Sequence, residues 1–350
     1  MKVGLVSPYD LGRFGGVQDQ VLQLASWLRD AGHTTVVVGP GTGPAGTVSL
    51  GPARVITVNG AAAPIRLDPR MAGQIATAVA DCDVVHVHEP LMPMVGLSAG
   101  RARGPALVGT FHADPSKPVR TAYRIGAPMV RRMLSRYDVI TAVSPVAASA
   151  IRTVAEPILV PNGVAVDTYT PAGGNPLRVA FLGRDDPRKG LDVLLEAWPD
   201  VHRTVPGAEL VVAAGDRSED LPGATFAGRV DETEKRALLA DAGVFCAPNT
   251  GGESFGIVLV EAMASRCAIV ASGLAAFVHV LGDAAALVKP GDAAGLAQTL
   301  VRLLRDPDAI AELQGRALER AGRYDREAVL TAYLGVYRRA IERHGARLTG

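Results

Sequence analysis

Residues 251–264 read GGESFGIVLVEAMA, a glycine-rich loop followed at once by an apolar helical run. The glycines leave backbone N–H groups uncovered at the start of this helix, where the helix dipole also favours an anion. Glu253 and Glu261 are eight positions apart, which corresponds to about 12 Å along a helix. Because a nucleotide sugar has this length from hexose to ribose, the stretch predicts a site for one, with its diphosphate over the helix N-terminus.

Around this stretch, short apolar strands alternate with helical patterns in two successive sets. Strands are predicted at residues 2–7, 34–38, 54–58, 84–88, 106–111 and 139–143, and again at 178–183, 209–214, 244–247, 268–271 and 285–288. Runs that are apolar throughout are typical of parallel strands covered on both faces. The pattern therefore predicts an α/β protein with two Rossmann-like, doubly wound domains and a ligand cleft between the carboxyl ends of their sheets.

Turn-forming segments at 161–163 (PNG) and 171–176 (PAGGNP) separate the two sets. Proline and glycine clusters of this kind end regular structure. We therefore predict a first domain at residues 1–166, a second at 167–325, and a final helical segment at 326–350.

Composition excludes several classes of protein. The 350 residues are 48% hydrophobic and 20% charged, as in ordinary globular proteins, and the net charge of +1 argues against a nucleic-acid partner held by a bulk positive field. The three cysteines lie far apart with no metal-ligand spacing, which indicates a reduced, cytoplasmic compartment. We expect neither a signal peptide nor a transmembrane helix.

Three further motifs indicate phosphate and sugar chemistry. Gly15 and Gly16 precede a helical pattern and repeat the anion-binding arrangement in the first domain, although GxGxxG, the mark of nicotinamide dehydrogenases, is absent. Arg184 and Lys189, in GRDDPRKG at 183–190, are predicted to neutralise a leaving diphosphate without a metal. His112 ends GTFH at a strand terminus, where it can hydrogen-bond a sugar hydroxyl or remain inert.

Several segments of the chain together resemble the retaining glycosyltransferases of the GT-B fold, family four. These segments are residues 1–9 with 15–17, 86–90 (HVHEP), 109–112, 160–164 (VPNGV), 183–190 and 251–261. The resemblance covers nearly the whole chain. Within that family the likeness is to the actinobacterial phosphatidylinositol mannosyltransferases. It implies transfer of mannose from GDP-mannose to the inositol of a phospholipid, with no metal or other cofactor, and a final helix 326–350 that packs back on the first domain.

The resemblance also implies roles for the matching residues. The catalytic set would be His112, Arg184, Lys189 and Glu253, with Glu253 on the transferred sugar and His112 beside the reaction centre. The donor would be bound by Gly16, Arg229, Val230, Phe255, Gly256, Ile257 and Glu261, with Glu261 on the ribose. The acceptor would be bound by Tyr9, Asn59 and Arg66.

The sequence departs from the family in its membrane-binding features. The stretch 68–77, where the family has a run of basic residues, holds only Arg70, and Pro64 stands where an arginine is expected. A different stretch, 115–137, carries six basic residues and no acidic one: Lys117, Arg120, Arg124, Arg131, Arg132 and Arg136. Its interleaved apolar residues are compatible with peripheral docking on the inner face of the plasma membrane, with a kink at Pro128. The alternative is a solvated helix.

Other functions remain open at this stage. Asp81-Cys82-Asp83 imitates the DxD metal motif of other glycosyltransferases but precedes its strand, so it is interpreted as a turn. The same fold allows a UDP-sugar donor with a soluble or other lipid acceptor. A GT-B nucleotide-sugar epimerase would need paired acid–base carboxylates in the cleft, and a non-catalytic sensor would have no use for Arg184 and Lys189.

Overall fold

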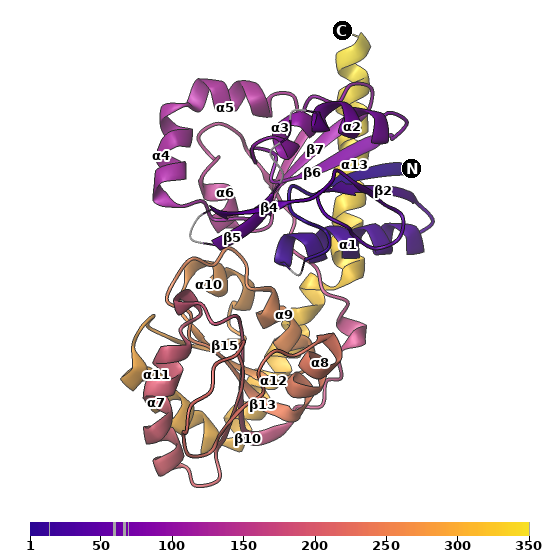
Figure 1. The fold of residues 1–350 in the computed structure, drawn as a ribbon. Helices are drawn as coiled ribbons and strands as arrows, with labels where there is room; N and C mark the ends of the chain where they lie inside the picture. Colours follow the sequence, from indigo (N-terminus) through magenta and orange to yellow (C-terminus); the bar gives the residue numbers. More distant parts are fainter. Residues whose placement is uncertain (14, 59–60, 66–67, 69, 350) are drawn as a thin grey trace. The chain divides into compact units, whose positions relative to one another are not determined.

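The computed structural model describes residues 1–13, 15–58, 61–65, 68 and 70–349. The chain divides into two compact units, unit 1 at residues 1–162 with 329–350, and unit 2 at residues 163–328. Each unit contains a parallel sheet with helices packed on it (Figure 1). The predicted α/β class with two parallel sheets is confirmed.

Unit 1 is built on a parallel sheet of seven strands among its described residues. In spatial order these are β3 (Thr47–Ser49), β2 (Thr34–Gly39), β1 (Lys2–Val6), β6 (Val84–His88), β7 (Ala106–Phe111), β8 (Val139–Ala142) and β9 (Ile158–Leu159). Every residue of β6 and β7 is buried, which explains why these runs are apolar throughout. The chain reverses its direction of travel across the sheet between β1 and β6, and ligands of open α/β sheets bind at such points.

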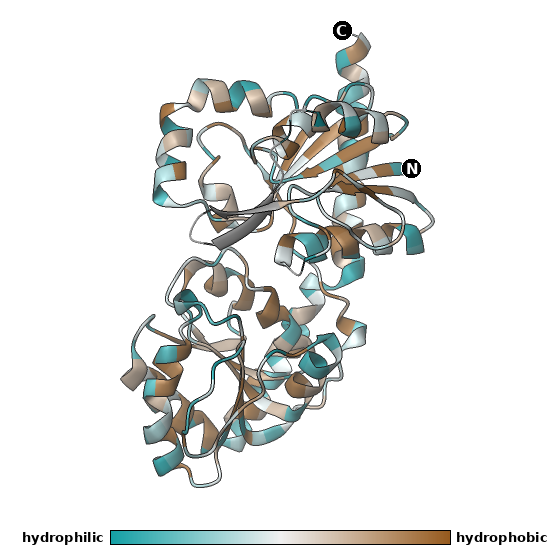
Figure 2. Ribbon diagram, viewed as in Figure 1, coloured by the Kyte–Doolittle hydropathy of each residue, from teal (hydrophilic) through white to brown (hydrophobic). Residues whose placement is uncertain are grey.

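The helices of unit 1 are α1 (Gly16–Asp30), α2 (Met71–Ala78), α3 (Val95–Ala99), α4 (Lys117–Ile125), α5 (Ala127–Leu134) and α6 (Pro145–Ser149), together with most of α13 (Arg326–Thr349). Brown, hydrophobic residues concentrate in the central strands in Figure 2. None of the helices in the described part of the chain is both long and apolar enough to cross a bilayer.

Two predictions about unit 1 are corrected. Residues 54–58 do form a strand, β4 (Arg54–Val58), but it pairs antiparallel with β5 (Ala61–Ile65) outside the main sheet. Two residues separate these strands, whereas a parallel crossover needs a dozen or more. The basic stretch is broken at Gly126, between α4 and α5, and not at Pro128, which lies in the first turn of α5 where its missing N–H costs nothing.

Unit 2 is built on a parallel sheet of six strands among its described residues. In spatial order these are β12 (Ala224–Phe226), β11 (Glu209–Ala213), β10 (Asn175–Leu182), β13 (Ala242–Ala247), β14 (Ala268–Ser272) and β15 (Ala285–Val288). Its α-helices are α7 (Leu191–Thr204), α8 (Glu232–Asp241), α9 (Ile257–Ala264), α10 (Ala275–Leu281), α11 (Ala293–Leu304) and α12 (Pro307–Ala321). After β10 the chain adds β11 and β12 on one side of this strand, and then β13, β14 and β15 on the other side. The loops after β10 and β13 are therefore the expected ligand site of unit 2.

Candidate active site

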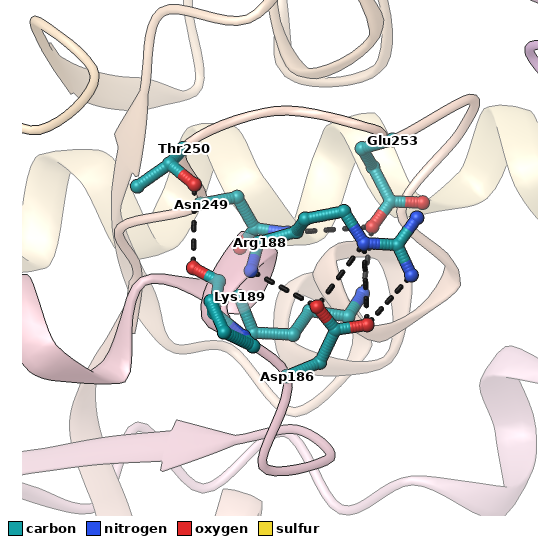
Figure 3. Close-up of polar contacts among 7 residues, drawn as sticks. Asp186, Arg188, Lys189, Asn249, Thr250 and Glu253 are labelled. Carbon is teal, nitrogen blue, oxygen red and sulfur yellow. Dashed lines mark hydrogen bonds and ion pairs between the residues drawn. The ribbon is translucent and has the colours of Figure 1, made fainter. Parts of the chain in front are cut away.

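An ion pair joins the loops that follow β10 and β13 in unit 2. Nζ of Lys189 lies 2.7 Å from Oε2 of Glu253, and the side-chain amide of Asn249 donates to the same oxygen at 3.4 Å (Figure 3). The Lys189 side chain is 27% exposed and that of Glu253 is 16% exposed. The pair is therefore partly shielded from water yet open to a ligand.

Glycine permits these loops to approach each other closely. Gly190 has a φ of 71°, and a Cβ there would lie 2.0 Å from the carbonyl oxygen of Pro248. The backbone N–H of Thr250 donates to the carbonyl of Arg188 at 2.9 Å, which ties the two loops together. The GRDDPRKG segment therefore reaches GGESFG through a contact that only glycine allows.

The guanidinium of Arg188 is paired with the carboxylate of Asp186. Its Nη2 lies 2.6 Å from Oδ2 of Asp186, and its Nε lies 3.1 Å from Oδ1 of the same carboxylate (Figure 3). These hydrogen bonds lower the pKa of Asp186 to about 2. Arg184, two residues earlier, is exposed. Lys189 and Arg184 are thus the cations of this loop that Asp186 does not bind.

The GGESFG loop leads into α9 as predicted. Gly256 caps the helix with a φ of 91°, and α9 begins at Ile257. Phe255 is buried and packs edge-to-face on Tyr324, with ring centroids 5.6 Å apart. This aromatic contact fixes the loop at the start of α9, and the N-terminus of a helix is a place where backbone N–H groups and the helix dipole favour an anion.

Glu261 is held one turn into α9 by two residues that the sequence analysis missed. Its Oε1 lies 2.7 Å from Nζ of Lys235, on α8, and accepts a hydrogen bond from the Tyr169 hydroxyl at 3.1 Å. Both side chains of the ion pair are nearly buried, and the guanidinium of Arg236 lies over the Tyr169 ring. The sequence signal for this contact was the position of Lys235, five residues after the predicted donor-binding residue Val230.

The predicted donor-binding residues Arg229 and Val230 lie in the loop before α8. Arg229 is highly exposed, and its guanidinium lies 3.7 Å from the Asp216 carboxylate. Val230 is half-buried beside it. This pair is exposed to solvent and orders the loop only weakly.

In unit 1, His112 is fixed directly after β7. The Glu89 carboxylate, which follows β6, accepts the backbone N–H of His112 at 2.8 Å and that of Ala113 at 2.7 Å. Burial nevertheless raises the pKa of Glu89 to about 7 and lowers the pKa of His112 to about 4. The imidazole of His112 bonds to His88, with Nε2 and Nδ1 separated by 2.8 Å.

Tyr9 and Gly16 lie at the same carboxyl edge of the sheet, after β1. Burial, with the charge of Glu89 acting in the same direction, raises the pKa of Tyr9 well above its usual value. The same two causes raise the pKa of Tyr123 to about 12. Gly16 is the exposed first residue of α1. The predicted acceptor residues Asn59 and Arg66 lie outside the described residues.

The remaining predicted features have structural explanations. Asp81 forms an ion pair with Lys2, and Asp83 accepts the backbone N–H of Lys2 at 2.7 Å, so this stretch is a turn that contacts β1. Within the described ranges, no group of three His, Cys, Asp or Glu side chains is arranged to hold a metal ion. The structure thus gathers Lys189, Glu253 and Glu261 with α9 in unit 2, and Tyr9 and His112 in unit 1.

Comparisons with known proteins show the family to which the chain belongs. Residues 14–168 match the model of the family described as Glycosyltransferase Family 4, and residues 176–306 match that described as Glycosyl transferases group 1. The phosphatidyl-myo-inositol mannosyltransferase of Mycolicibacterium smegmatis is 40% identical over 362 residues, which cover 96% of this chain and 93% of that protein. The enzyme of the same name from Mycobacterium tuberculosis strain H37Rv is 38% identical and covers 96% of each chain.

Solved structures share the fold. Anabaena HepE in complex with UDP and glucose superposes with a TM-score of 0.75 at 17% identity, over 96% of this chain and 99% of that one. Sucrose-phosphate synthase from Thermosynechococcus elongatus superposes with a TM-score of 0.70 at 21% identity, over 96% and 98% of the two chains. Both likenesses support the GT-B fold.

Proposed function

Because the chain belongs to glycosyltransferase family 4, we propose that it transfers mannose from the nucleotide sugar GDP-mannose to the inositol ring of phosphatidylinositol. The observation that carries this proposal is the identity, along nearly the whole chain, to enzymes named phosphatidyl-myo-inositol mannosyltransferase, a name that gives the sugar and the acceptor. The Lys189–Glu253 pair and the held carboxylate of Glu261 supply groups suited to a diphosphate, a sugar and a ribose.

The proposed reaction retains the configuration at the sugar's anomeric carbon. The bond from that carbon to the diphosphate breaks, a bond to an inositol hydroxyl oxygen forms on the same face, and the hydroxyl proton passes to the leaving diphosphate. Lys189 and Arg184 stabilise the negative charge that grows on the diphosphate, with the N-terminus of α9 beneath it. These cations perform the task that a metal ion performs in other glycosyltransferases.

Glu253 and Glu261 would hold the two ends of the donor. Glu253 accepts hydrogen bonds from Lys189 and Asn249, which orient its carboxylate toward sugar hydroxyls. Glu261, held by Lys235 and Tyr169, would accept from the ribose hydroxyls. Hydrogen bonds from charged groups to substrate hydroxyls discriminate strongly, because losing one leaves a buried group unpaired.

Calorimetric titration of the purified full chain with GDP, GDP-mannose, UDP and UDP-glucose tests the donor. We expect binding of the guanine pair only, followed by mannosylated lipid when phosphatidylinositol vesicles are added with GDP-mannose. A preference for the uridine pair would overturn the mannosyl assignment and favour the second candidate, a UDP-sugar transferase, which the fold of the UDP-bound neighbour accommodates. Glu261→Gln shows whether the nucleotides bind at the proposed site, since the loss of the ribose contact should weaken the binding of every nucleotide.

A lipid acceptor requires contact with a membrane, and the surface of α4 and α5 suits an anionic one. Residue hydropathy alternates along both helices (Figure 2), with Ile125 78% exposed and Met129 57% exposed. The basic residues around them are exposed except for Arg120, which pairs with Asp114. Arg132 and Arg136 line a hollow of about 90 Å³ with Met129. We propose that this surface docks peripherally on anionic phospholipid at the inner face of the plasma membrane, each cation contributing about 1 kcal/mol.

Vesicle co-sedimentation tests the docking surface. We expect the chain to pellet with vesicles of phosphatidylcholine and phosphatidylglycerol, and not with phosphatidylcholine alone. The double variant R132E/R136E should abolish pelleting, whereas R203E/R302E, on unit 2, should leave it unchanged. Equal pelleting with both vesicles, or an unaffected R132E/R136E variant, would overturn the assignment of this surface.

A further inference from the structure

A hollow of about 90 Å³ opens on the surface of unit 1, between α3 and α5 (Figure 1). α3 contributes Leu97 to its lining, and α5 contributes Met129 and Met133. Tyr137, which follows α5, adds a buried aromatic ring. A volume of this size holds several water molecules. The hollow therefore has room for a small polar group such as a phosphate, but not for a lipid tail.

Three arginines border this hollow, and they come from two separate segments of the chain. Arg132 and Arg136 belong to the basic stretch 115–137 that the sequence indicated. Arg101 lies just after α3 and was not among the predicted residues. All three residues are exposed, and none of the described residues that line the hollow is acidic. Folding thus adds a third cation to two that were already close in the sequence.

None of these arginines is neutralised by a carboxylate of the described part of the chain. Neither Arg101, nor Arg132, nor Arg136 forms an ion pair there. Arg120 on α4, by contrast, pairs with Asp114. Three guanidinium groups around one hollow repel one another, and an anion that enters the hollow relieves this repulsion. The hollow is therefore a candidate anion site.

The chemistry of the guanidinium group favours a phosphate as this anion. A guanidinium presents its N–H donors in a planar fork that bonds two oxygens of a phosphate at once, whereas an ammonium group acts as a point charge. A phosphodiester has two unesterified oxygens that share one negative charge. Guanidinium groups from two sides of a small hollow can bind both of these oxygens.

The apolar residues beside the hollow indicate that the phosphate belongs to a lipid. Met129, in the lining, is 57% exposed, and Ile125, at the end of α4, is 78% exposed. Apolar side chains on the same surface as basic ones gain free energy by entering the interfacial region of a bilayer. A soluble phosphate would leave both side chains in water. Basic pockets at a membrane surface are typical sites for anionic head groups.

We propose that the hollow binds the phosphodiester of one anionic phospholipid through Arg101, Arg132 and Arg136, while Met129 and Ile125 enter the bilayer surface. Binding to the membrane then depends on the geometry of the guanidinium groups, and not only on the total positive charge of the surface. This inference rests on the proposed docking of α4 and α5 at a membrane, and it does not depend on which sugar the chain transfers.

Arginine-to-lysine variants separate a head-group site from a diffuse basic surface, because they keep the charge and remove the planar fork. Arg101→Lys should weaken the binding of the full chain to vesicles of phosphatidylcholine and phosphatidylglycerol by about tenfold in co-sedimentation. Arg124→Lys is the matched control, because Arg124 is exposed on α4 and does not line the hollow. It should bind as the parent does. Circular dichroism establishes that both variants are folded.

The outcomes distinguish failure of the docking surface from failure of the hollow. If the parent does not bind anionic vesicles, both proposals are overturned. If the parent binds and Arg101→Lys binds equally well, or if both lysine variants lose equally, the docking surface stands and the head-group site is overturned.

Inorganic phosphate tests whether the ligand is a lipid. Compared with chloride at equal ionic strength, phosphate should release little protein from the vesicles, because it replaces the contact with the head group but not the contacts of Met129 and Ile125 with the bilayer. Complete release by phosphate and not by chloride would assign the hollow to a soluble phosphate and overturn the lipid assignment.

Discussion

Each unit contributes one group of candidate residues, called here its half-site, at the carboxyl edge of its parallel sheet. The two half-sites differ in the chemistry of their side chains. In unit 1, His86, His88 and His112 are buried, and this burial lowers the pKa of each ring. Hydrogen bonds join His86 to Tyr337 on α13, and His88 to His112. In unit 2, Lys189 and Glu253 are charged, partly exposed and carried on loops.

This difference matches two requirements of transfer chemistry. A buried hydrogen-bonded network in a low-dielectric interior holds its side chains in place, because breaking one of its hydrogen bonds would leave a polar atom buried and unpaired. An ion pair at a partly exposed loop is weaker, so a diphosphate can compete with Glu253 for Lys189. Under the proposed function, unit 1 would orient reactants, and Lys189 in unit 2 would exchange Glu253 for a charged ligand.

The largest expected effect is on the charged half-site. Lys189→Ala should lower kcat by about 10³-fold, since it removes charge stabilisation from the leaving diphosphate. Lys189→Arg should recover part of the rate, because it keeps the charge. Steady-state transfer from GDP-mannose measures both, with circular dichroism to establish that the fold is retained. A rate within tenfold of the parent for Lys189→Ala would remove this residue from the catalytic set.

Glu253→Gln should lower kcat by about 10²-fold, because an amide neither pairs with Lys189 nor binds sugar hydroxyls as strongly. The same assay measures it. Asp186→Asn, in the neighbouring ion pair with Arg188, is the matched control and should cost about tenfold or less. If both variants lose equally, Glu253 contributes through loop structure and not through the sugar.

The neutral half-site should make stability depend on pH. The three histidines have native pKa values below that of an unfolded histidine, so only the unfolded state binds their protons as the pH falls from 7.5 to 5.5, and stability declines by about 1 kcal/mol for each. Glu89 acts in the opposite direction, because its native pKa of about 7 lies above the unfolded value. The net expected loss is about 2 kcal/mol.

Calorimetric melting of the full chain at the two pH values measures this loss. His86→Phe removes one of the three proton sites, and its melting should therefore depend less on pH than that of the parent, whatever its stability at pH 7.5. If the melting of His86→Phe depended on pH as strongly as that of the parent, His86 would titrate alike in the folded and unfolded chain. The contrast between the two half-sites would then fail.

The smallest expected effect concerns the ribose contact. Glu261→Gln should weaken the binding of GDP and GDP-mannose by about tenfold while changing kcat less than Glu253→Gln does, since in the proposed function Glu261 binds the ribose and Glu253 binds the transferred sugar. Titration calorimetry measures the affinity. Tyr169→Phe removes only the hydroxyl that donates to Glu261, and it should cost less than Glu261→Gln. An unchanged affinity in Glu261→Gln would place the ribose elsewhere.

Sequence reasoning predicted the parts of each half-site that lie within one continuous segment. The strands that reach Gly183 and Pro248, the loop 251–256 and the helix after it were all recognisable from glycine and apolar patterns. Lys235 and Tyr169 were missed, because each reaches Glu261 from a separate element. The partner of β4 was also missed, since an apolar run predicts a strand but not the direction of its neighbour.

The amino-acid sequence by itself determined the α/β class, the two sheets and the glycine loops, because these depend on periodicity and on backbone freedom between neighbours in the chain. Only the tertiary structure decided which side chains meet. Tyr337 and His86 are 251 residues apart yet bonded, and Lys189 and Glu253 are 64 apart. Burial and partners set by folding determine how far the pKa of a histidine is lowered and whether a lysine is already paired, and no local pattern of residues contains that information.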